Sequence, residues 1–211
     1  ALSAPYTIWM TVFIVLPMLL VGYFALTDRA GNFTLENLLS VGQYSNVFLR
    51  SIWLGALATL ISLLLGYPLA YIISKMSVKR QSMMVMLVML PMWMNFLLRT
   101  LAWQTLLEKT GVINSILSVL HLPSLNIINT PYAIVLGMVY NFLPFMVLPL
   151  YNVLVKIDKN VINAAYDLGA NGIQTFLRII FPLSLPGMFS GITMVFVPAL
   201  TTFVISKILG G

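Results

Sequence analysis

The chain of 211 residues contains no cysteine, a single histidine and few charged side chains. Without cysteine it can form no disulfide, no thiolate metal site and no cysteine nucleophile. His121 has no second ligand at metal-binding spacing, so we predict a surface residue rather than a zinc ligand. The Gly-x-x-x-x-Gly-Lys-Ser/Thr loop that cradles nucleotide phosphates is also missing. Because no paired carboxylates, histidine cluster or activated nucleophile occurs in the apolar segments, a membrane enzyme is disfavoured.

Apolar residues are abundant instead. They make up 60% of the chain against 8% charged residues, and the mean hydropathy is +1.00, far above the range of a soluble domain. A membrane-crossing helix needs roughly 20 apolar residues. Five runs meet or approach that length, the fourth with a loop inside it: Ala1–Thr27, Ser51–Ser74, Gln81–Leu98, Thr110–Val155 and Ile179–Ser206.

These runs predict an all-α, polytopic membrane protein that forms a single transmembrane domain over residues 1–211. The first run has no basic leader and no small-residue cleavage site, so it is predicted to be a retained span rather than a signal peptide. Because the chain starts at Ala1 and stops just after its fifth run, we expect a sixth helix to be missing.

The distribution of Lys and Arg predicts the orientation, since these residues are retained on the cytoplasmic side. One set of alternate loops carries six of them and the opposite set four. This bias places the N-terminus in the cytoplasm, residues 75–82 and 156–181 inside, and residues 28–49 and 108–130 outside. The net charge of +6 comes from residues that flank the spans singly, so it indicates a lipid bilayer and no nucleic acid.

Small residues and prolines within the runs indicate how the helices pack. Gly187 with Gly191 has the spacing that lets two helix backbones approach closely, and Gly55 with Thr59 and Gly66 with Ala70 repeat it. Prolines inside the runs are expected to kink the helices: Pro17, Pro68, Pro91, Pro144, Pro149 and Pro198.

Residues 158–182 form a polar segment between the last two runs. Asp158 can cap a short helix that ends at Gly169, and Asn171 can cap a second helix that Pro182 ends. The first helix is predicted to have one apolar face, and so is the second: Val161, Ala164, Ala165 and Leu168, then Ile173, Phe176, Leu177 and Ile180. This helix–Gly–helix elbow is either a docking element for another protein or a hairpin that lies on the lipid headgroups.

The elbow resembles the loop that defines permease subunits of binding-protein-dependent ABC importers, in which Glu-Ala-Ala is followed three residues later by Gly. Asn163-Ala164-Ala165 and Gly169 match this pattern, with Asn163 in place of the usual Glu. The resemblance implies a type I importer permease fold and a cytoplasmic coupling loop at residues 158–182. It assigns contact with the ATPase to Asn163, Ala164, Ala165, Asp167, Leu168, Gly169 and Phe176.

Other segments are similar to spermidine/putrescine permeases, above all the B-type subunit. They include residues 90–93, Leu98-Arg99-Thr100-Leu101-Ala102-Trp103, where Leu101 replaces the usual Tyr, residues 140–151, and the ending Leu209-Gly210-Gly211. Weaker versions occur in iron, thiamine and phosphonate importers. A self-contained secondary transporter or channel is the remaining alternative, but no broken-helix coupling site or inverted repeat was found.

The resemblance implies a bacterial cell-membrane permease that imports polyamines and is not itself an enzyme. Its expected partners are two ATPase subunits, a second and different permease chain, and an external solute-binding protein. No cofactor or metal is expected in this chain, because ATP and Mg²⁺ belong to the ATPase.

A polyamine is a flexible polycation, for which carboxylates and aromatic rings are suitable ligands. Asp28 and Glu36 are external acids that either line the entrance or are ordinary loop charges. Arg99 would repel a polycation, so we expect it to be structural, paired with Glu108 or bonded to carbonyl groups. The candidate pathway residues are Trp93, Asn95, Trp103, Glu108, Tyr140 and Asn141, with Tyr151 as a further aromatic. The aromatic and amide side chains can instead serve helix packing or anchor the chain at the membrane interface, and Glu108 can be an ordinary loop charge.

Overall fold

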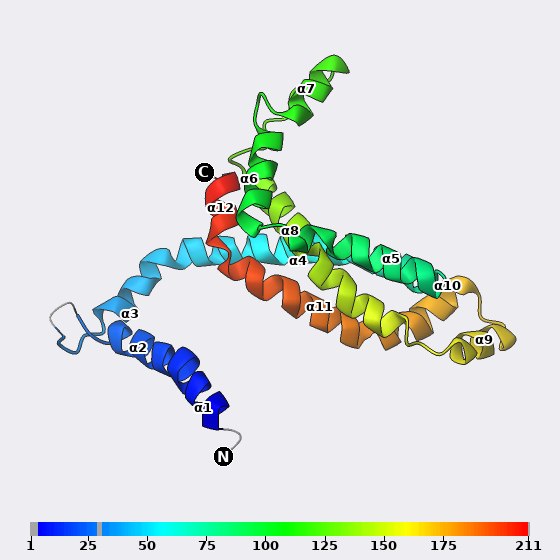
Figure 1. Ribbon diagram of the computed structural model, residues 1–211, viewed down its shortest axis with the longest axis horizontal. Helices are drawn as coiled ribbons and strands as arrows, with labels where there is room; N and C mark the ends of the chain where they lie inside the picture. The colour runs from blue at the N-terminus through cyan, green and yellow to red at the C-terminus, as the bar shows by residue number, and fades with distance from the viewer. Residues whose placement is uncertain (1–3, 29–30, 211) are drawn as a thin grey trace. The chain divides into compact units, whose positions relative to one another are not determined.

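The chain is almost entirely helical in the computed structural model, which describes residues 4–28 and 31–210 (Figure 1). Within these residues the only β pairing is one antiparallel bridge between Thr27 and Phe33. The prediction of an all-α membrane protein is therefore confirmed. Ala1, Arg29 and Gly211, on which parts of the sequence argument rest, lie outside the described residues.

Two compact units make up the chain, Ala1–Arg50 and Ser51–Gly211. The first contains one continuous apolar helix and two short turns of helix after it: α1 (Ala4–Met10), the π-helical turn η1 (Thr11–Val15), α2 (Leu16–Ala25), α3 (Glu36–Ser40) and the 3₁₀ turn η2 (Val41–Tyr44). Asn37 fastens α3 to the end of α2, because its Nδ2 donates to the carbonyl groups of Phe24 (3.1 Å) and Thr27 (2.9 Å).

The second unit contains the rest of the helices, with α4 beginning a few residues before it. They are α4 (Ser45–Ser74), α5 (Val78–Met89), η3 (Leu90–Trp93), α6 (Phe96–Leu107), α7 (Val112–Val119), α8 (Pro131–Leu154), α9 (Lys159–Asp167), α10 (Gly172–Thr175), the π-helical turn η4 (Phe176–Ile180), α11 (Phe181–Thr201) and α12 (Phe203–Gly210).

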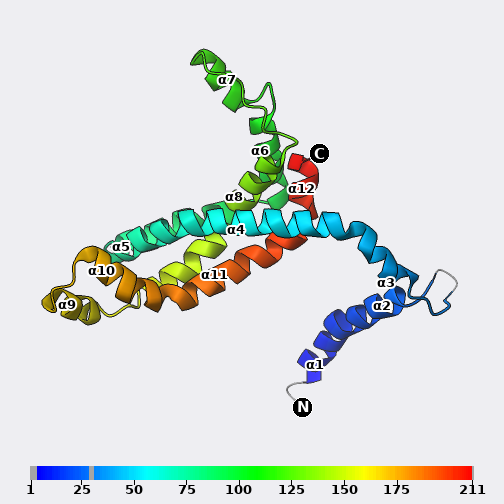
Figure 2. The ribbon, with the colours of Figure 1, turned by 180° about the vertical axis from the view of Figure 1, so that it is seen from behind.

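The core of this unit forms around α8, which packs against α11 along its length and against α12, α5 and α6 (Figures 1 and 2). Glycines permit the close approach. A Cβ on Gly187 would lie 2.8 Å from the Pro149 carbonyl oxygen, and one on Gly191 would lie 2.7 Å from Met146 Sδ. On α4, a Cβ on Gly66 would meet Met146 Cγ at 2.9 Å. The predicted role of the small residues in helix contact is confirmed.

Four helices of the described residues are long and apolar enough to cross a membrane. They correspond to four of the five predicted spans: Ala4–Ala25, Gly42–Ser74, Pro131–Leu154 and Gly172–Thr201. A fifth crossing results if the bent pair Val78–Trp93 and Phe96–Val119 counts as one span. The predicted number of spans is therefore matched only when this bent pair is included.

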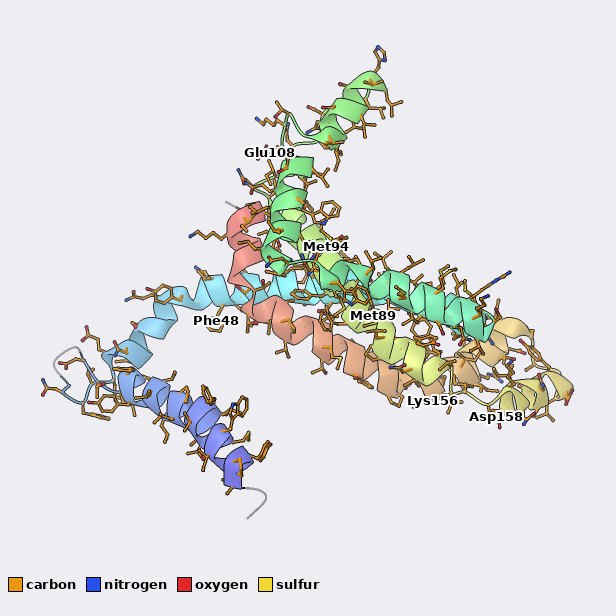
Figure 3. The ribbon with its side chains drawn as sticks, viewed as in Figure 1. Phe48, Met89, Met94, Glu108, Lys156 and Asp158 are labelled. Atoms are coloured by element: carbon orange, nitrogen blue, oxygen red, sulfur yellow. The ribbon has the colours of Figure 1, made fainter. Side chains whose placement is uncertain are left out.

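The third apolar run is not the single helix that Gln81–Leu98 predicts. Its two helical parts meet at 89°, with the break at Met94 and Asn95, between Met89 and Glu108 in Figure 3. Pro91 lies in the tight 3₁₀ turn before the break. Asn95 leaves the helical conformation and caps α6, because its Oδ1 accepts hydrogen bonds from Leu97 N (2.9 Å) and Leu98 N (3.3 Å).

The prediction that Pro182 ends the second elbow helix is wrong. The helix continues from Gly172 to Thr201, because the π-helical turn η4 precedes the proline and the Phe181 N–H donates to the Phe176 carbonyl. The wider turn accommodates Pro182, which has no N–H to donate and whose ring would crowd the carbonyl four residues earlier in an α-helix. The same arrangement, η1 followed by Pro17, occurs in the first span.

The fifth run is also divided. Thr202 adopts an extended conformation after α11, and α12 then packs against α8 and α6 with Ile205 and Leu209 fully buried. Asn129 N–H donates to the Leu209 carbonyl (2.9 Å), which ties the end of α12 to the loop before α8.

Candidate coupling site and pathway residues

The first helix of the elbow begins and ends at the residues that the sequence predicts. Asp158 caps α9, since its Oδ1 accepts from Asn160 N (2.9 Å). At the other end, Gly169 has φ +83°, a conformation that side-chain-bearing residues rarely adopt. Ala170 N–H donates to the Ala165 carbonyl (3.0 Å) and Gly169 N–H to the Tyr166 carbonyl (2.9 Å), which is the Schellman pattern of a helix terminus.

The second elbow helix has a reciprocal cap. Asn171 Oδ1 accepts from Gln174 N (2.9 Å), and Gln174 Oε1 accepts from Asn171 N (3.0 Å). This capping box satisfies two donors that the helix start would otherwise leave open. Hydrogen bonds thus fix the turn on both sides, at the end of α9 and at the start of α10. The two helices and their caps occupy eighteen residues, from Asp158 to Thr175.

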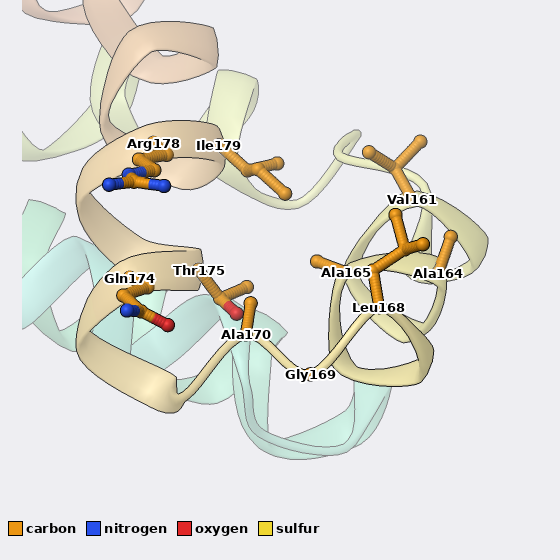
Figure 4. A pocket seen from close by; sticks show the side chains of 10 residues that line it. All are labelled: Val161, Ala164, Ala165, Leu168, Gly169, Ala170, Gln174, Thr175, Arg178 and Ile179. Atoms are coloured by element: carbon orange, nitrogen blue, oxygen red, sulfur yellow. The ribbon is translucent and has the colours of Figure 1, made fainter.

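A groove of about 410 Å³ separates the two helices, with α9 on one side and α10 and η4 on the other (Figure 4). The predicted apolar face of α9 lines it. The residues around it are Val161, Ala164, Ala165, Leu168, Gly169, Ala170, Gln174, Thr175, Arg178 and Ile179. The elbow therefore presents an apolar wall facing a polar one that carries a guanidinium group.

The predicted coupling residues differ in exposure. Asn163, Asp167 and Leu168 are exposed, and Leu168 keeps 88% of its surface accessible although it is apolar. Ala164 is also exposed, whereas Ala165 is buried against the groove.

Phe176 differs from the other predicted coupling residues because its side chain is half-buried. It packs edge-on against Tyr67 (5.8 Å between ring centroids) and Tyr71 (5.5 Å) of α4, and also contacts Phe181. Ser184 on α11 receives a hydrogen bond from the Tyr67 hydroxyl (2.8 Å) and donates its own to the Phe181 carbonyl. These contacts connect the elbow to α4 and the start of α11.

Sequence reasoning missed the polar wall of the groove, formed by Gln174, Thr175 and Arg178, and the bond between Tyr67 and Ser184. Gln174 and Thr175 belong to α10, and Arg178 lies within the π-helical turn η4, whose wider turn changes the direction of its side chain relative to an α-helix. Polar residues opposite the predicted apolar face were the available signal.

The acidic pathway candidates fall in different units. Asp28 and Glu36 line a pocket of about 600 Å³ in the first unit together with Phe24, Thr27, Thr34 and Asn37. Glu108 belongs to the second unit, where it is exposed at the far end of α6 (Figure 3). Asp28 already accepts a hydrogen bond from Asn32 N (2.9 Å).

Trp93 and Asn95 lie at the break of the third run and are both exposed, Trp93 at 72%. Trp103 and Tyr140 contact each other edge-on, with centroids 5.1 Å apart, and line an apolar groove between α4, α6 and α8. Asn141 lies inside the bundle with 1% exposure, and its Nδ2 donates to the Gly137 carbonyl (2.7 Å). The Tyr151 hydroxyl donates to Gln81 Oε1 (3.1 Å) on α5.

Arg99 was predicted to be structural, either paired with Glu108 or bonded to carbonyl groups, and the structure shows a carbonyl partner. Its Nη1 donates to the Pro91 carbonyl across the break, and its guanidinium lies over the rings of Phe96 and Tyr140, at 5.9 Å from each centroid. Glu108 is nine residues further along α6, which corresponds to roughly 13 Å of helix. The carbonyl contact is present, whereas an ion pair with Glu108 is not formed.

Within residues 4–28 and 31–210, no three His, Asp or Glu side chains gather as a metal site would require. His121 is exposed at the end of α7 with φ +56°.

Comparisons with known proteins found a matching family and several similar proteins. Residues 62–211 match the family described as binding-protein-dependent transport system inner membrane component. The chain is 38% identical to the spermidine/putrescine transport system permease protein PotB of Haemophilus influenzae, over 96% of this chain and 74% of that protein. It is 37% identical to PotB of Escherichia coli, over 96% and 78%. A PotB homolog of Mycoplasma genitalium is 31% identical, over 99% and 73%.

Proposed function

The chain belongs to the family of binding-protein-dependent transport system inner membrane components, and we propose that it is the permease subunit of an importer for spermidine and putrescine. The observation that carries this proposal is the identity of 37–38% to two spermidine/putrescine permeases over 96% of the chain. The apolar helices agree with a multi-pass protein of the inner membrane.

The sequence contains no Gly-x-x-x-x-Gly-Lys-Ser/Thr loop to bind nucleotide phosphates, so ATP that drives this importer is bound by another chain. We therefore propose that two separate ATPase subunits bind ATP and Mg²⁺. A second permease and an external binding protein complete the assembly, so this chain itself is a conduit and not an enzyme.

The elbow is the proposed contact with the ATPase, and the proposed orientation with a cytoplasmic N-terminus puts it on the cytoplasmic side. Three features support this role: the exposed Leu168, the groove between α9 and η4, and the rigid caps at both helix ends. A firmly capped elbow transmits a push to the spans better than a loose loop. Phe176 then passes the movement to Tyr67 and Tyr71 of α4.

For the cargo route we propose the six pathway candidates in two roles. Trp93, Asn95 and Glu108 are exposed and available to an ammonium group in this conformation. Trp103 and Tyr140 are half-buried, and Asn141 is enclosed, so they reach the cargo only if the helices move. The two acids of the first unit, Asp28 and Glu36, are suited to attract a polycation at the entrance.

The assembly is tested by purifying the tagged chain with its ATPase and comparing Leu168→Asp with Val119→Asp. Both residues are exposed and apolar, at 88% and 77%, so neither change should unfold the chain. Leu168 is on the elbow and Val119 is at the end of α7, which we place on the opposite side of the membrane. We expect Leu168→Asp to reduce recovery of the ATPase by about tenfold, equivalent to ~1.4 kcal/mol, and Val119→Asp to leave it unchanged.

The ATPase rate of the reconstituted wild type is then measured with the binding protein and a panel of solutes. Stimulation by spermidine or putrescine is the expected result. Stimulation by thiamine, a phosphonate or an iron complex alone would keep the importer and replace its cargo. No association with an ATPase would favour a self-contained transporter.

A further inference from the structure

Gln81 is a buried amide whose hydrogen bonds join α4, α5 and α8. Its side chain is 8% exposed. Its Nε2 donates to the carbonyl group of Ser74 (3.1 Å), the last residue of α4, and to that of Met76 (2.9 Å) in the turn before α5. Its Oε1 accepts a hydrogen bond from the hydroxyl group of Tyr151 on α8 (3.1 Å). Both amide hydrogens are used, so Gln81 is a satisfied polar group in an otherwise apolar region.

This network lies next to both limbs of the elbow, and Figures 1 and 2 show the start of α5 beside α10. On one limb, Tyr151 is three residues before the end of α8, which leads into the elbow. On the other limb, Phe176 packs against Tyr67 and Tyr71 of α4, and the Tyr67 hydroxyl donates to Ser184 of α11. Side-chain contacts therefore attach α5 to the first limb and α4 to the second.

From this network α5 leads to the break in the third apolar run. Gln81 lies in the first turn of α5, and the helical stretch Val78–Trp93 continues through η3. It ends at the 89° break, where the pathway candidates Trp93 and Asn95 are exposed. Trp93 is twelve residues after Gln81, which corresponds to roughly 18–20 Å of helix. A short helix is stiff, so a displacement at Gln81 reaches the break.

We propose that Gln81 is a positioning residue for transport, which couples the elbow to α5. When the ATPase moves the elbow, the end of α8 moves with it, and the hydrogen bond from Tyr151 makes the start of α5 follow. The far end of α5 then resets Trp93 and Asn95. The inference rests on the proposed function, from which it takes the ATPase and the cargo route. It adds a path through α8 and α5 to the one from Phe176 to α4.

The geometry favours transmission over a cap that serves α4 alone. A cap needs only the two bonds from Nε2, which stay within α5 and the turn before it. The bond from Tyr151 instead joins residues 70 positions apart. Further along α5, the half-buried side chains that pack against the core are Met84, Val85 and Val88. Apolar contacts of this kind are non-directional and resist separation more than sliding, whereas a hydrogen bond holds one register.

The test measures the number of ATP molecules hydrolysed per solute molecule transported, with the complete complex and the binding protein in proteoliposomes. Gln81→Leu removes all three hydrogen bonds of the amide, and Tyr151→Phe removes only the one between α8 and α5. We expect each variant to raise this ratio about threefold or more, the size of effect that follows loss of one hydrogen bond.

Ser82→Ala is the matched control and should keep the wild-type ratio. Ser82 is the exposed neighbour of Gln81, and its hydroxyl bonds within α5 to the Val78 carbonyl. Tyr151→Phe removes a single oxygen atom, so it keeps the proposal testable even if Gln81→Leu folds poorly. Thermal unfolding of each variant in detergent is measured alongside. A purely structural role would lower the unfolding temperature and leave the ratio unchanged, which overturns the proposal.

The double variant separates coupling from direct contact with the cargo. If both residues act through their shared hydrogen bond, the double variant should have the same ratio as Gln81→Leu. If Tyr151 contacts the cargo instead, Tyr151→Phe should raise the solute concentration for half-maximal transport, and its effect should add to that of Gln81→Leu. Additive effects, or wild-type ratios in both single variants, overturn the proposal.

The wild-type complex is measured with spermidine, putrescine and the other solutes of the panel. If it transports only another solute and the variants raise the ratio for that solute, the cargo is wrong and the role of Gln81 stands. If it transports polyamines and the variants keep its ratio, the role of Gln81 is wrong and the proposed function stands. A wild type without ATP-dependent transport of any solute overturns both.

Discussion

At the scale of single residues, Gly169 has the clearest physical role in the elbow. Its φ of +83° is the left-handed conformation, and nothing lies within 4 Å of a Cβ built on it. A side chain at this position would meet no steric obstacle from neighbours, so any cost comes from the backbone conformation itself. The requirement for glycine is thus a requirement of the turn.

We predict that Gly169→Val destabilises the end of α9 by about 1–2 kcal/mol, because a left-handed conformation is costly for a branched residue. Gly169→Asn should cost less, since asparagine tolerates this region. Hydrogen exchange of the α9 amides measures the effect, with an acceleration of roughly 5–30-fold expected for valine.

Gly172→Ala is the matched control for Gly169, because it also has free space around its Cβ but ordinary backbone angles. It should leave the exchange of α9 unchanged. Equal rates for Gly169→Val and wild type would show that the turn does not depend on this glycine.

Asn95 is a second residue whose role can be isolated. Its Oδ1 accepts from the amides of Leu97 and Leu98 at the start of α6. We predict that Asn95→Ala destabilises this helix start by about 1 kcal/mol and that Asn95→Asp retains the cap. The readout is exchange at those two amides, and equal behaviour of both variants would contradict the capping role.

At the scale of elements, the contact between α8 and α11 determines how tightly the second unit packs. Gly187 lies against a backbone oxygen of Pro149, whereas the nearest atom to Gly191 is the sulfur of the flexible Met146 side chain. The two positions should therefore respond differently to the same methyl group.

We predict that Gly187→Ala destabilises the chain by about 1–3 kcal/mol, as overpacking against backbone does, and that Gly191→Ala costs less. Gly22→Ala on α2 has no atom within 4 Å of the new methyl and should be neutral or slightly stabilising. Thermal unfolding in detergent compares the three. A larger loss for Gly191→Ala than for Gly187→Ala would contradict the packing described here.

Apolar length alone predicted where the long helices lie, and small-residue spacing predicted their close contacts. The breaks were not predictable in the same way. Residues 83–94 and 96–98 are apolar on both sides of Asn95, so the hydropathy of this run does not indicate that Asn95 leaves the helix and caps a new one. The π-helical turn before Pro182 was missed because this proline predicts a helix end, although a wider turn can accommodate it. Pro17 was expected to kink its helix, and the π-helical turn before it was not predicted.

In the candidate site, too, features set by neighbouring residues were predictable and features set by distant contacts were not. Asp158, Gly169 and Asn171 were identified correctly as caps because capping depends on local chemistry. The burial of Asn141 and Arg99 and the position of Phe176 against α4 depend on contacts between distant segments. No single-sequence pattern contains that information.

At the scale of the whole molecule, the absence of native cysteine makes the proposed orientation directly measurable. We predict that Val119→Cys reacts with a membrane-impermeant maleimide from outside intact cells. Leu168→Cys should react only after the membrane is opened. Both residues are largely exposed, so a difference reports the side of the membrane and not burial. The reverse pattern would place the elbow outside and exclude contact with a cytoplasmic ATPase.

The central claim, that this chain conducts polyamines into the cytoplasm under the control of a partner ATPase, is tested most directly by uptake of labelled solute. Proteoliposomes carry the complete complex in the membrane and ATP inside, on the side of the ATPase. The binding protein and labelled spermidine or putrescine are added outside. We predict ATP-dependent accumulation that unlabelled polyamine suppresses and thiamine does not. Accumulation of another solute without any polyamine uptake, or polyamine uptake that is independent of ATP, would contradict the account.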